Sequence, residues 1–196
     1  MMWRTYGTIM MVAALFAGGC GGRSDGQGRT AAGQAVGAAG NPSSASSAVS
    51  RIEPCSLLTK DEIQEQVEQS HSPSQLAGLK SKGVVWTISM ESVPQGASRI
   101  CQVAWQGAVN GEVSTKGDFS VNVTYADWLK GSVAGMTHPL PIPNLGDEAY
   151  FVGGKSGPPY ARVGDVAIGI ENFPDTRESK SGLALLRLAV PRARAH

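Results

Sequence analysis

Three cysteines carry the most specific chemistry in this chain. Cys20 follows an apolar N-terminal stretch whose last residues, 17–19, are small, which is typical of a signal peptide cleaved before a lipid-acylated cysteine. Cys55 and Cys101 are then the remaining thiols of the mature chain, and an oxidising compartment is expected to join them. We therefore predict lipidation of Cys20 and a disulfide between Cys55 and Cys101.

The N-terminal segment defines the domain organisation. Residues 1–19 are predicted to be a signal peptide, because their apolar run is well short of the roughly 20 residues that a membrane-spanning helix needs. Ala17 stands where leucine is usual before a lipidated cysteine, so cleavage without lipidation is the alternative. Residues 20–50 are rich in Gly, Ala and Ser and predict a flexible tether, while residues 51–196 suit one domain. This organisation predicts a lipid-anchored protein of the bacterial cell envelope, outside the cytoplasm.

The charge balance argues against one class of partner. The chain has 17 Lys and Arg against 16 Asp and Glu, and removal of the signal peptide takes away only Arg4, which leaves 16 of each sign. A neutral chain is not typical of a protein that binds nucleic acid. The expected partners are the membrane, through the lipid anchor, and an envelope protein or an apolar small molecule.

No constellation of residues identifies a reaction. His71, His138 and His196 do not have the spacing of a ligand pair, so no metal site is predicted. The segment 154–156, Gly-Lys-Ser, lacks the earlier glycine and the following helix of a phosphate-binding loop. A Gly-x-Ser-x-Gly elbow is also absent, and the adjacent carboxylates at 147–148 point to opposite faces if they lie in a strand. We predict no cofactor and no catalytic residue.

The tryptophans are the remaining candidates for ligand binding. Trp86, Trp105 and Trp128 have large apolar rings that could line a pocket for an apolar molecule. Tryptophans at such spacing more often fill a core, and this is the alternative interpretation.

The elements that would position these residues begin with a helix. Thr59 and Glu62 have the spacing of a capping box, and Leu58 with Ile63 can form a hydrophobic staple. The helix is predicted to run to about Gln69. Residues 70–82 are predicted to be a loop with at most a short helical turn.

Three strands are predicted next, at 84–90, 99–106 and 119–125, from their β-branched and aromatic residues. The first two flank a break at 94–96 and predict a hairpin. Period-two alternation places Cys101 with Val103 and Trp105 on a buried face, and it leaves the opposite face of the sheet to water.

The rest of the chain predicts further helices and strands around this sheet. A short helix is expected at 126–134, an extended proline-rich connection at 138–144, a strand at 147–152 and a hairpin of 160–163 with 166–170. A last helix starts at Ser181 and is expected to stop at Pro191. Strands in runs, with helices at both ends, predict an α+β domain: a mainly antiparallel sheet carrying an N-terminal and a C-terminal helix, with one disulfide.

Several segments together resemble the mostly actinobacterial lipoproteins grouped as domain of unknown function 3558. The likeness spans most of residues 53–190. It is carried, in order, by Pro-Cys-Ser-Leu-Leu-Thr at 54–59, Cys101 to Trp105, Leu-Gly-Asp-Glu-Ala-Tyr-Phe at 145–151, the turn at 162–165 and the Leu/Ala-rich final helix. This resemblance implies an exported, anchored α+β domain with a disulfide, and it brings no established activity.

These observations favour a lipid-anchored, non-catalytic binding or interaction module of the envelope. Two alternatives stay open: an exported hydrolase-type enzyme whose groups meet only in the fold, and a carrier of a lipid or other apolar ligand. The carrier predicts an enclosed cavity around Trp86, Trp105 or Trp128. The enzyme predicts a cleft with a His or a carboxylate next to a nucleophile, whereas the module predicts a shallow polar sheet face.

Overall fold

The computed structural model describes residues 42–174 and 180–196, which belong to one compact unit. Cys20 and the predicted signal peptide lie outside the described residues. The helices are α1 Pro42–Arg51, the 3-10 turn η1 Pro54–Ser56, α2 Lys60–Ser70, α3 Pro73–Ser81, α4 Ala126–Ala134 and α5 Ser181–Ala193. The strands are β1 Val85–Gln95, β2 Ser98–Val109, β3 Glu112–Tyr125, β4 Leu140–Pro141, β5 Glu148–Phe151, β6 Pro159–Val163 and β7 Val166–Glu171.

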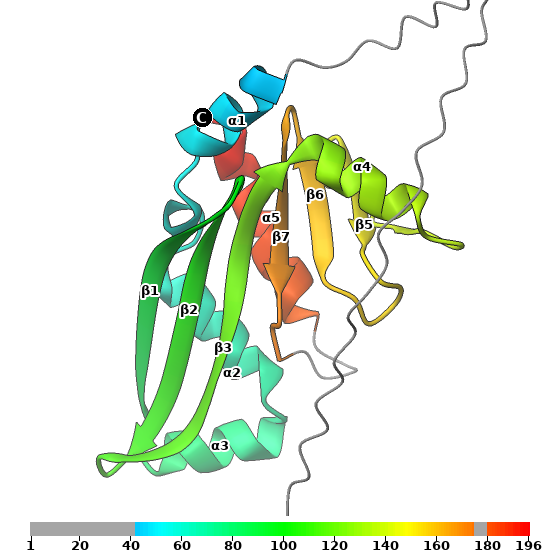
Figure 1. Ribbon diagram of the computed structural model, residues 1–196. Helices are drawn as coiled ribbons and strands as arrows, with labels where there is room; N and C mark the ends of the chain where they lie inside the picture. Colours follow the sequence, from blue (N-terminus) through cyan, green and yellow to red (C-terminus); the bar gives the residue numbers. More distant parts are fainter. Residues whose placement is uncertain (1–41, 175–179) are drawn as a thin grey trace, which may run out of the picture. The chain divides into compact units, whose positions relative to one another are not determined.

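The strands form one antiparallel sheet in the order β1-β2-β3-β7-β6-β5-β4. Helices α2 and α5 lie on one face of this sheet, and α4 lies on the other (Figure 1). The predicted α+β class, with helices near both ends of the chain packed on a mainly antiparallel sheet, is confirmed. We call the face under α2 and α5 the inner face and the opposite face the outer face.

Helix α2 begins at the predicted capping box. The Thr59 backbone N–H donates to Glu62 Oε2 at 2.8 Å, and the Glu62 backbone N–H donates to Thr59 Oγ1 at 3.3 Å. Ile63 and Val67 are completely buried on the sheet side of the helix. These reciprocal bonds satisfy two of the backbone donors that a helix start leaves free, so the local sequence suffices to place this end.

Two segments predicted to be irregular are helical. Residues 70–82 contain α3, because Ser72 forms a second capping box with Gln75 and Pro73 occupies the first turn, where its missing N–H costs nothing. The tether predicted to reach residue 50 ends earlier, since α1 covers Pro42–Arg51. Val49, only 3% exposed, attaches this helix to the core, so the folded unit begins before residue 51.

The final helix also differs from the prediction. Pro191 does not stop it, and α5 continues to Ala193. A proline in the last turn removes one helical hydrogen bond, while Val190 and Ala193 on either side of it stay buried in the core. Packing of the last turn therefore outweighs the local signal.

Strand register in the sheet is supported by aromatic rings that lie on cross-strand glycines. Trp105 pairs with Gly117, where an added Cβ would approach the indole to 2.6 Å. Trp86 covers Gly107 in the same way, with a corresponding distance of 2.9 Å. Each glycine provides the flat space that the ring opposite it needs, which fixes the pairing of β1, β2 and β3.

The predicted disulfide is present. Cys55 in η1 and Cys101 in β2 are bonded, with their Cα atoms 5.0 Å apart. Cys101 is completely buried in the inner-face core. The bond ties the chain before α2 to the second strand, and it is consistent with an extracytoplasmic protein. Among the described residues, no helix is long and apolar enough to cross a membrane.

Candidate functional site

The two faces of the sheet are covered unequally. On the inner face, side chains from β2, β3, β6 and β7 pack with η1, α1, α2 and α5 into one large apolar core. On the outer face, α4 covers β6, β7 and the end of β3, where Thr124 is 1% exposed and Tyr160 is completely buried. The prediction of a wet outer face therefore holds over most of β1 and β2 and the rest of β3, but it is wrong under α4 and at Ile100 of β2, which is 9% exposed.

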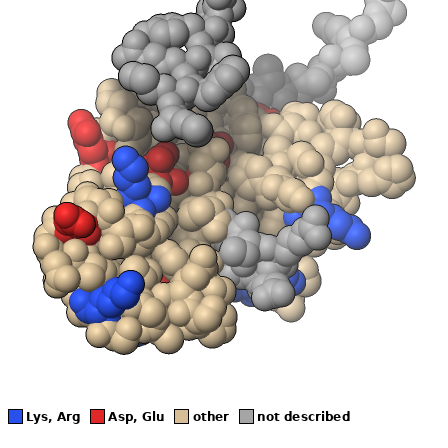
Figure 2. Space-filling view, turned by 90° about the horizontal axis from the view of Figure 1, so that it is seen from below, with Lys and Arg blue, Asp and Glu red and all other residues tan. Residues whose placement is uncertain are grey.

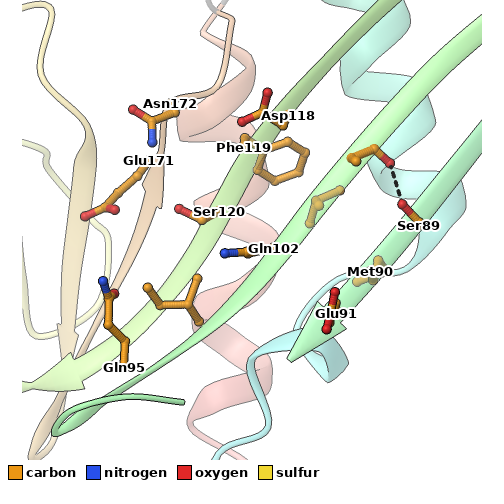
Figure 3. Close-up of a pocket in the computed structure, with 13 residues that line it drawn as sticks. Ser89, Met90, Glu91, Gln95, Gln102, Asp118, Phe119, Ser120, Glu171 and Asn172 are labelled. Atoms are coloured by element: carbon orange, nitrogen blue, oxygen red, sulfur yellow. Dashed lines mark hydrogen bonds between the residues drawn. The ribbon is translucent and has the colours of Figure 1, made fainter. Parts of the chain in front are cut away.

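Polar side chains line the uncovered part. The strand register aligns Glu91 with Gln102, Gln102 with Ser120, and Ser120 with Glu171, so these four side chains form a row across β1, β2, β3 and β7. Figure 3 shows this row with its polar neighbours on the outer face. We call the following residues the polar face: Ser89, Glu91, Gln102, Asp118, Ser120, Glu171 and Asn172. They line a shallow hollow of about 810 Å³.

The polar face is acidic. Its lining residues include the carboxylates of Glu91, Asp118 and Glu171 but no Lys, Arg or His. In the described part of the chain, none of these three carboxylates takes part in an ion pair. Lys116 lies in an adjoining hollow of about 540 Å³ that it shares with Asp118. The face thus carries negative charge that its own lining residues do not neutralise.

Two side chains, those of Tyr160 and Asn122, hold Glu171 in place by hydrogen bonds. Tyr160 Oη donates a hydrogen bond to Glu171 Oε1, and Asn122 Nδ2 donates to the same carboxylate oxygen at 3.4 Å and to Tyr160 Oη at 3.3 Å. Burial, together with the neighbouring carboxylate, raises the pKa of Tyr160, so its hydroxyl remains a neutral donor. These bonds engage Oε1, and no described residue donates a hydrogen bond to Glu171 Oε2.

The structure separates the three predicted pocket tryptophans. Trp86 and Trp105 lie together on the inner face with ring centroids 6.0 Å apart, and the His71 ring meets both edge-on, at 5.6 and 5.9 Å. Trp128 lies on α4 at the outer face and packs on Tyr160 at 4.7 Å. Trp86 and Trp105 thus pack with the core, Trp105 also lines the hollow of about 540 Å³, and Trp128 lies on the opposite face of the sheet.

One histidine lies next to a hydroxyl group. His71 Nδ1 is 2.8 Å from the Val67 carbonyl, to which it donates, and Nε2 is 3.2 Å from Thr115 Oγ1. Neither hollow described above is lined by His71 or Thr115. This pair therefore links the end of α2 to β3, and it has the geometry of a structural bond.

The carboxylates at 147–148 also serve the fold. Asp147 ends a loop, accepts a hydrogen bond from the Gly164 backbone N–H at 2.7 Å and pairs with Arg194 at 3.1 Å. Glu148 begins β5 and pairs with Arg162 at 2.6 Å. The hydrogen bond from Gly164, and then the two arginines, lower the pKa of Asp147, so it stays charged and fastens the β6–β7 turn.

Other classes of site find no support in the described residues. No group of three or more His, Cys, Asp or Glu could hold a metal ion there. On the face seen in Figure 2, at the end of the molecule that carries α3, basic and acidic side chains are scattered among uncharged ones. That view shows no continuous basic area of the kind that binds nucleic acid.

The sequence predicted a polar sheet face but did not identify its three carboxylates, because they are far apart in the chain. Glu91 lies just beyond the predicted end of the first strand, and Asp118 lies just before the predicted start of the third. Extending the period-two alternation by one residue at each of these ends would have placed both on the water-facing side. Glu171 joins them only through the β3–β7 pairing, which no local signal predicts.

The chain matches no protein-family model, and no curated protein or solved structure matches it. The resemblance to the lipoproteins of domain of unknown function 3558 therefore stays a prediction, and the candidate function rests on the geometry of the sheet.

Proposed function

We propose that this protein is a lipid-anchored, non-catalytic interaction module of the bacterial envelope, and that its polar face binds a basic segment of another envelope protein. The observation that carries the proposal is the uncovered sheet face, whose three carboxylates form no ion pair with any of the described residues. A broad, shallow and hydrated surface suits a macromolecular partner better than a small substrate.

The charge of the face selects the partner. Carboxylates that form no ion pair within the described residues attract Lys and Arg side chains, and complementary charge raises the rate and the specificity of association. Gln102 and Ser120 lie between Glu91 and Glu171 and add hydrogen-bonding groups along the same row. A partner segment with several basic residues would satisfy this row along its length.

The anchor and the compartment rest on separate observations. The disulfide supports an oxidising, extracytoplasmic location, and the position of Cys20 after an apolar stretch supports acylation. Intact-mass analysis of the full-length gene product from envelope membranes should give a chain that begins at Cys20 and carries acyl groups. A free thiol at Cys20 would contradict the anchor without touching the binding proposal.

The binding proposal is tested with oligolysine as a defined basic probe. We expect measurable binding by calorimetry at low salt, weakened at high salt because the charges are exposed. Removing three charges, with each exposed pair contributing about 0.5 kcal/mol, should weaken binding about tenfold. The test variant combines Glu91→Gln, Asp118→Asn and Glu171→Gln.

A matched control removes three exposed carboxylates elsewhere in the fold. It combines Glu65→Gln, Glu112→Gln and Asp165→Asn. The control should bind oligolysine as the original chain does. Both variants should remain folded, and the test variant should unfold at a lower urea concentration than the control because Glu171 accepts hydrogen bonds from Tyr160 and Asn122. Equal weakening in the two variants would reduce the effect to net charge and overturn the proposal.

A further inference from the structure

Strand β1 leaves one edge of the sheet open. It is 11 residues long and pairs with β2 on one side, and no strand pairs with its other side in the part of the chain that the structure describes. In an antiparallel ladder, alternate residues direct their N–H and C=O groups away from the neighbouring strand. The outer edge of β1 therefore presents a row of backbone donors and acceptors that no described strand pairs.

The opposite edge of the sheet, unlike β1, is protected against pairing with another strand. There β4 has only two residues, one of which is Pro141. Short edge strands, prolines and lysines are the usual means by which proteins prevent unwanted strand pairing. Strand β1 has a proline only near its end, at Pro94; the nine residues before it, 85–93, contain no proline and no lysine, and their single charge is Glu91.

The core is also incomplete beside this edge. Inner-face side chains of β2 are fully packed, with Val103 at 1% and Trp105 at 5% exposure. On β1, Ile88, which pairs with Trp105, is buried at 8% exposure, whereas Met90, which pairs with Val103, and Trp86 are partly exposed. An additional strand would place its own side chains against Trp86 and Met90 and bury apolar surface that is now in contact with water.

We propose that the outer edge of β1 accepts an extended segment of the partner as an eighth strand. That segment alternates small apolar residues, which face Trp86 and Met90, with polar residues on the outer face, where a Lys or Arg lies opposite Glu91. This inference rests on the proposed function and specifies how the basic partner docks. Strand addition of this kind obtains affinity from main-chain hydrogen bonds and specificity from alternate side chains.

Charge complementarity identifies the occupant as a basic segment. Glu91 on the outer face of β1 heads the row that continues through Gln102 to Ser120 and Glu171. A basic side chain on an added strand would stand at the end of this row, next to Glu91, where cross-strand pairs of opposite charge are favourable. The edge and the polar face then form one continuous binding surface.

The test uses nine-residue peptides of alternating valine and lysine or threonine with the full-length chain. Two isomers are N-methylated at alternate amides, one on each edge of the extended peptide. Methylation removes the donors on one edge only, so strand addition should weaken binding of one isomer by about tenfold or more and leave the other near the parent. Binding to the sheet face alone would affect both isomers equally and overturn the proposal.

Two further measurements sharpen this result. Hydrogen exchange should show that alternate amides of residues 85–93 become protected when the parent peptide binds. Glu91→Gln should weaken the parent peptide by up to about fivefold, the measured range of a cross-strand charge pair, whereas Glu65→Gln on α2 should have no effect. Unchanged exchange in β1 would contradict strand addition.

The outcomes also separate this inference from the proposed function. If both isomers bind alike while oligolysine binding still depends on the three carboxylates, the basic partner stands and strand addition falls. Sedimentation without peptide should show a monomer. If the chain instead forms a dimer, and Met90→Lys dissociates it, a second copy of this chain occupies the edge. That result would overturn the proposal of a basic partner segment at the edge.

Discussion

The inner and outer faces of the same sheet have different roles. The inner face carries the large apolar core, the disulfide and the contacts of α2 and α5. The outer face of β1, β2 and β3 carries exposed polar side chains and an open hollow. Adjacent residues on one strand therefore have opposite functions, since Cys101 fastens the fold while Gln102 faces solvent.

This difference predicts a division between stability and binding. Changes on the inner face should lower the free energy of unfolding and leave the affinity for a basic probe intact while the protein is folded. Changes on the polar face should lower the affinity for the basic probe and, Glu171 apart, leave the free energy of unfolding nearly unchanged.

Reduction of the disulfide should have the largest effect on stability. Cys55 and Cys101 are 46 residues apart in the chain, and the loop-entropy relation gives about 4 kcal/mol for a closure of this length. Urea unfolding followed by tryptophan fluorescence, with and without reductant, measures the loss. Reductant should not change the variant in which both cysteines are alanine. A loss below about 1 kcal/mol on reduction would contradict the stabilising role of the bond.

Truncation of Leu186 should have the next largest effect. This side chain is completely buried between α5 and the sheet, and Leu186→Ala should cost about 2 to 5 kcal/mol from lost burial and the cavity that remains. Leu188 on the same helix is 38% exposed, so Leu188→Ala should change stability by no more than about 0.5 kcal/mol. Equal effects of the two substitutions in urea unfolding would show that α5 does not pack as described.

The ion pair between α2 and α5 should have a smaller, pH-dependent effect. Arg192 donates to both carboxylate oxygens of Glu62, at 2.6 and 2.7 Å. These bonds, together with those from Thr59, lower the pKa of Glu62 from 4.5 to about 2. Because this pKa is depressed in the folded state, the stabilisation is complete above about pH 4.5 and disappears as the pH falls toward 2.

Glu62→Gln should therefore cost about 1 kcal/mol at neutral pH. The difference in unfolding free energy between Glu62→Gln and the original chain should shrink as the pH falls below about 4.5. Comparison with the variant isolates Glu62 from Glu53, Glu68 and Asp147, whose pKa values are also lowered. A difference that stays constant down to acid pH would contradict the assigned pKa.

Local signals predicted much of the fold. The capping box at Thr59, the alternation around Cys101 and the hairpin turn at Gly164 each depend on residues close in sequence, and each was confirmed. The disulfide followed from the count of thiols and the expected compartment. Helices α1 and α3 were not predicted, because their composition gives only a weak helical signal. Burial of Val49 against the core stabilises α1, and a second capping box begins α3.

The polar face could be predicted only in part. Alternation on β2 and β3 indicated a face exposed to water. Helix α4 covers one end of that face because it packs on β6 and β7, and the sequence did not predict this packing. The tryptophan pocket was predicted from the residue type alone, because the sequence did not show on which face of the sheet each ring lies. Register places Trp86 and Trp105 inside and Trp128 on the opposite face.

The most direct test of the central claim is to map a basic probe onto the two faces. Hydrogen exchange of the full-length chain, with and without oligolysine, compares the amides of β1, β2 and β3 with those of α2 and α5. We expect protection to rise in the three strands and to stay unchanged in the two helices. Protection concentrated in α2 or α5, with the strands unaffected, would show that the basic probe binds the helical layer and not the polar face.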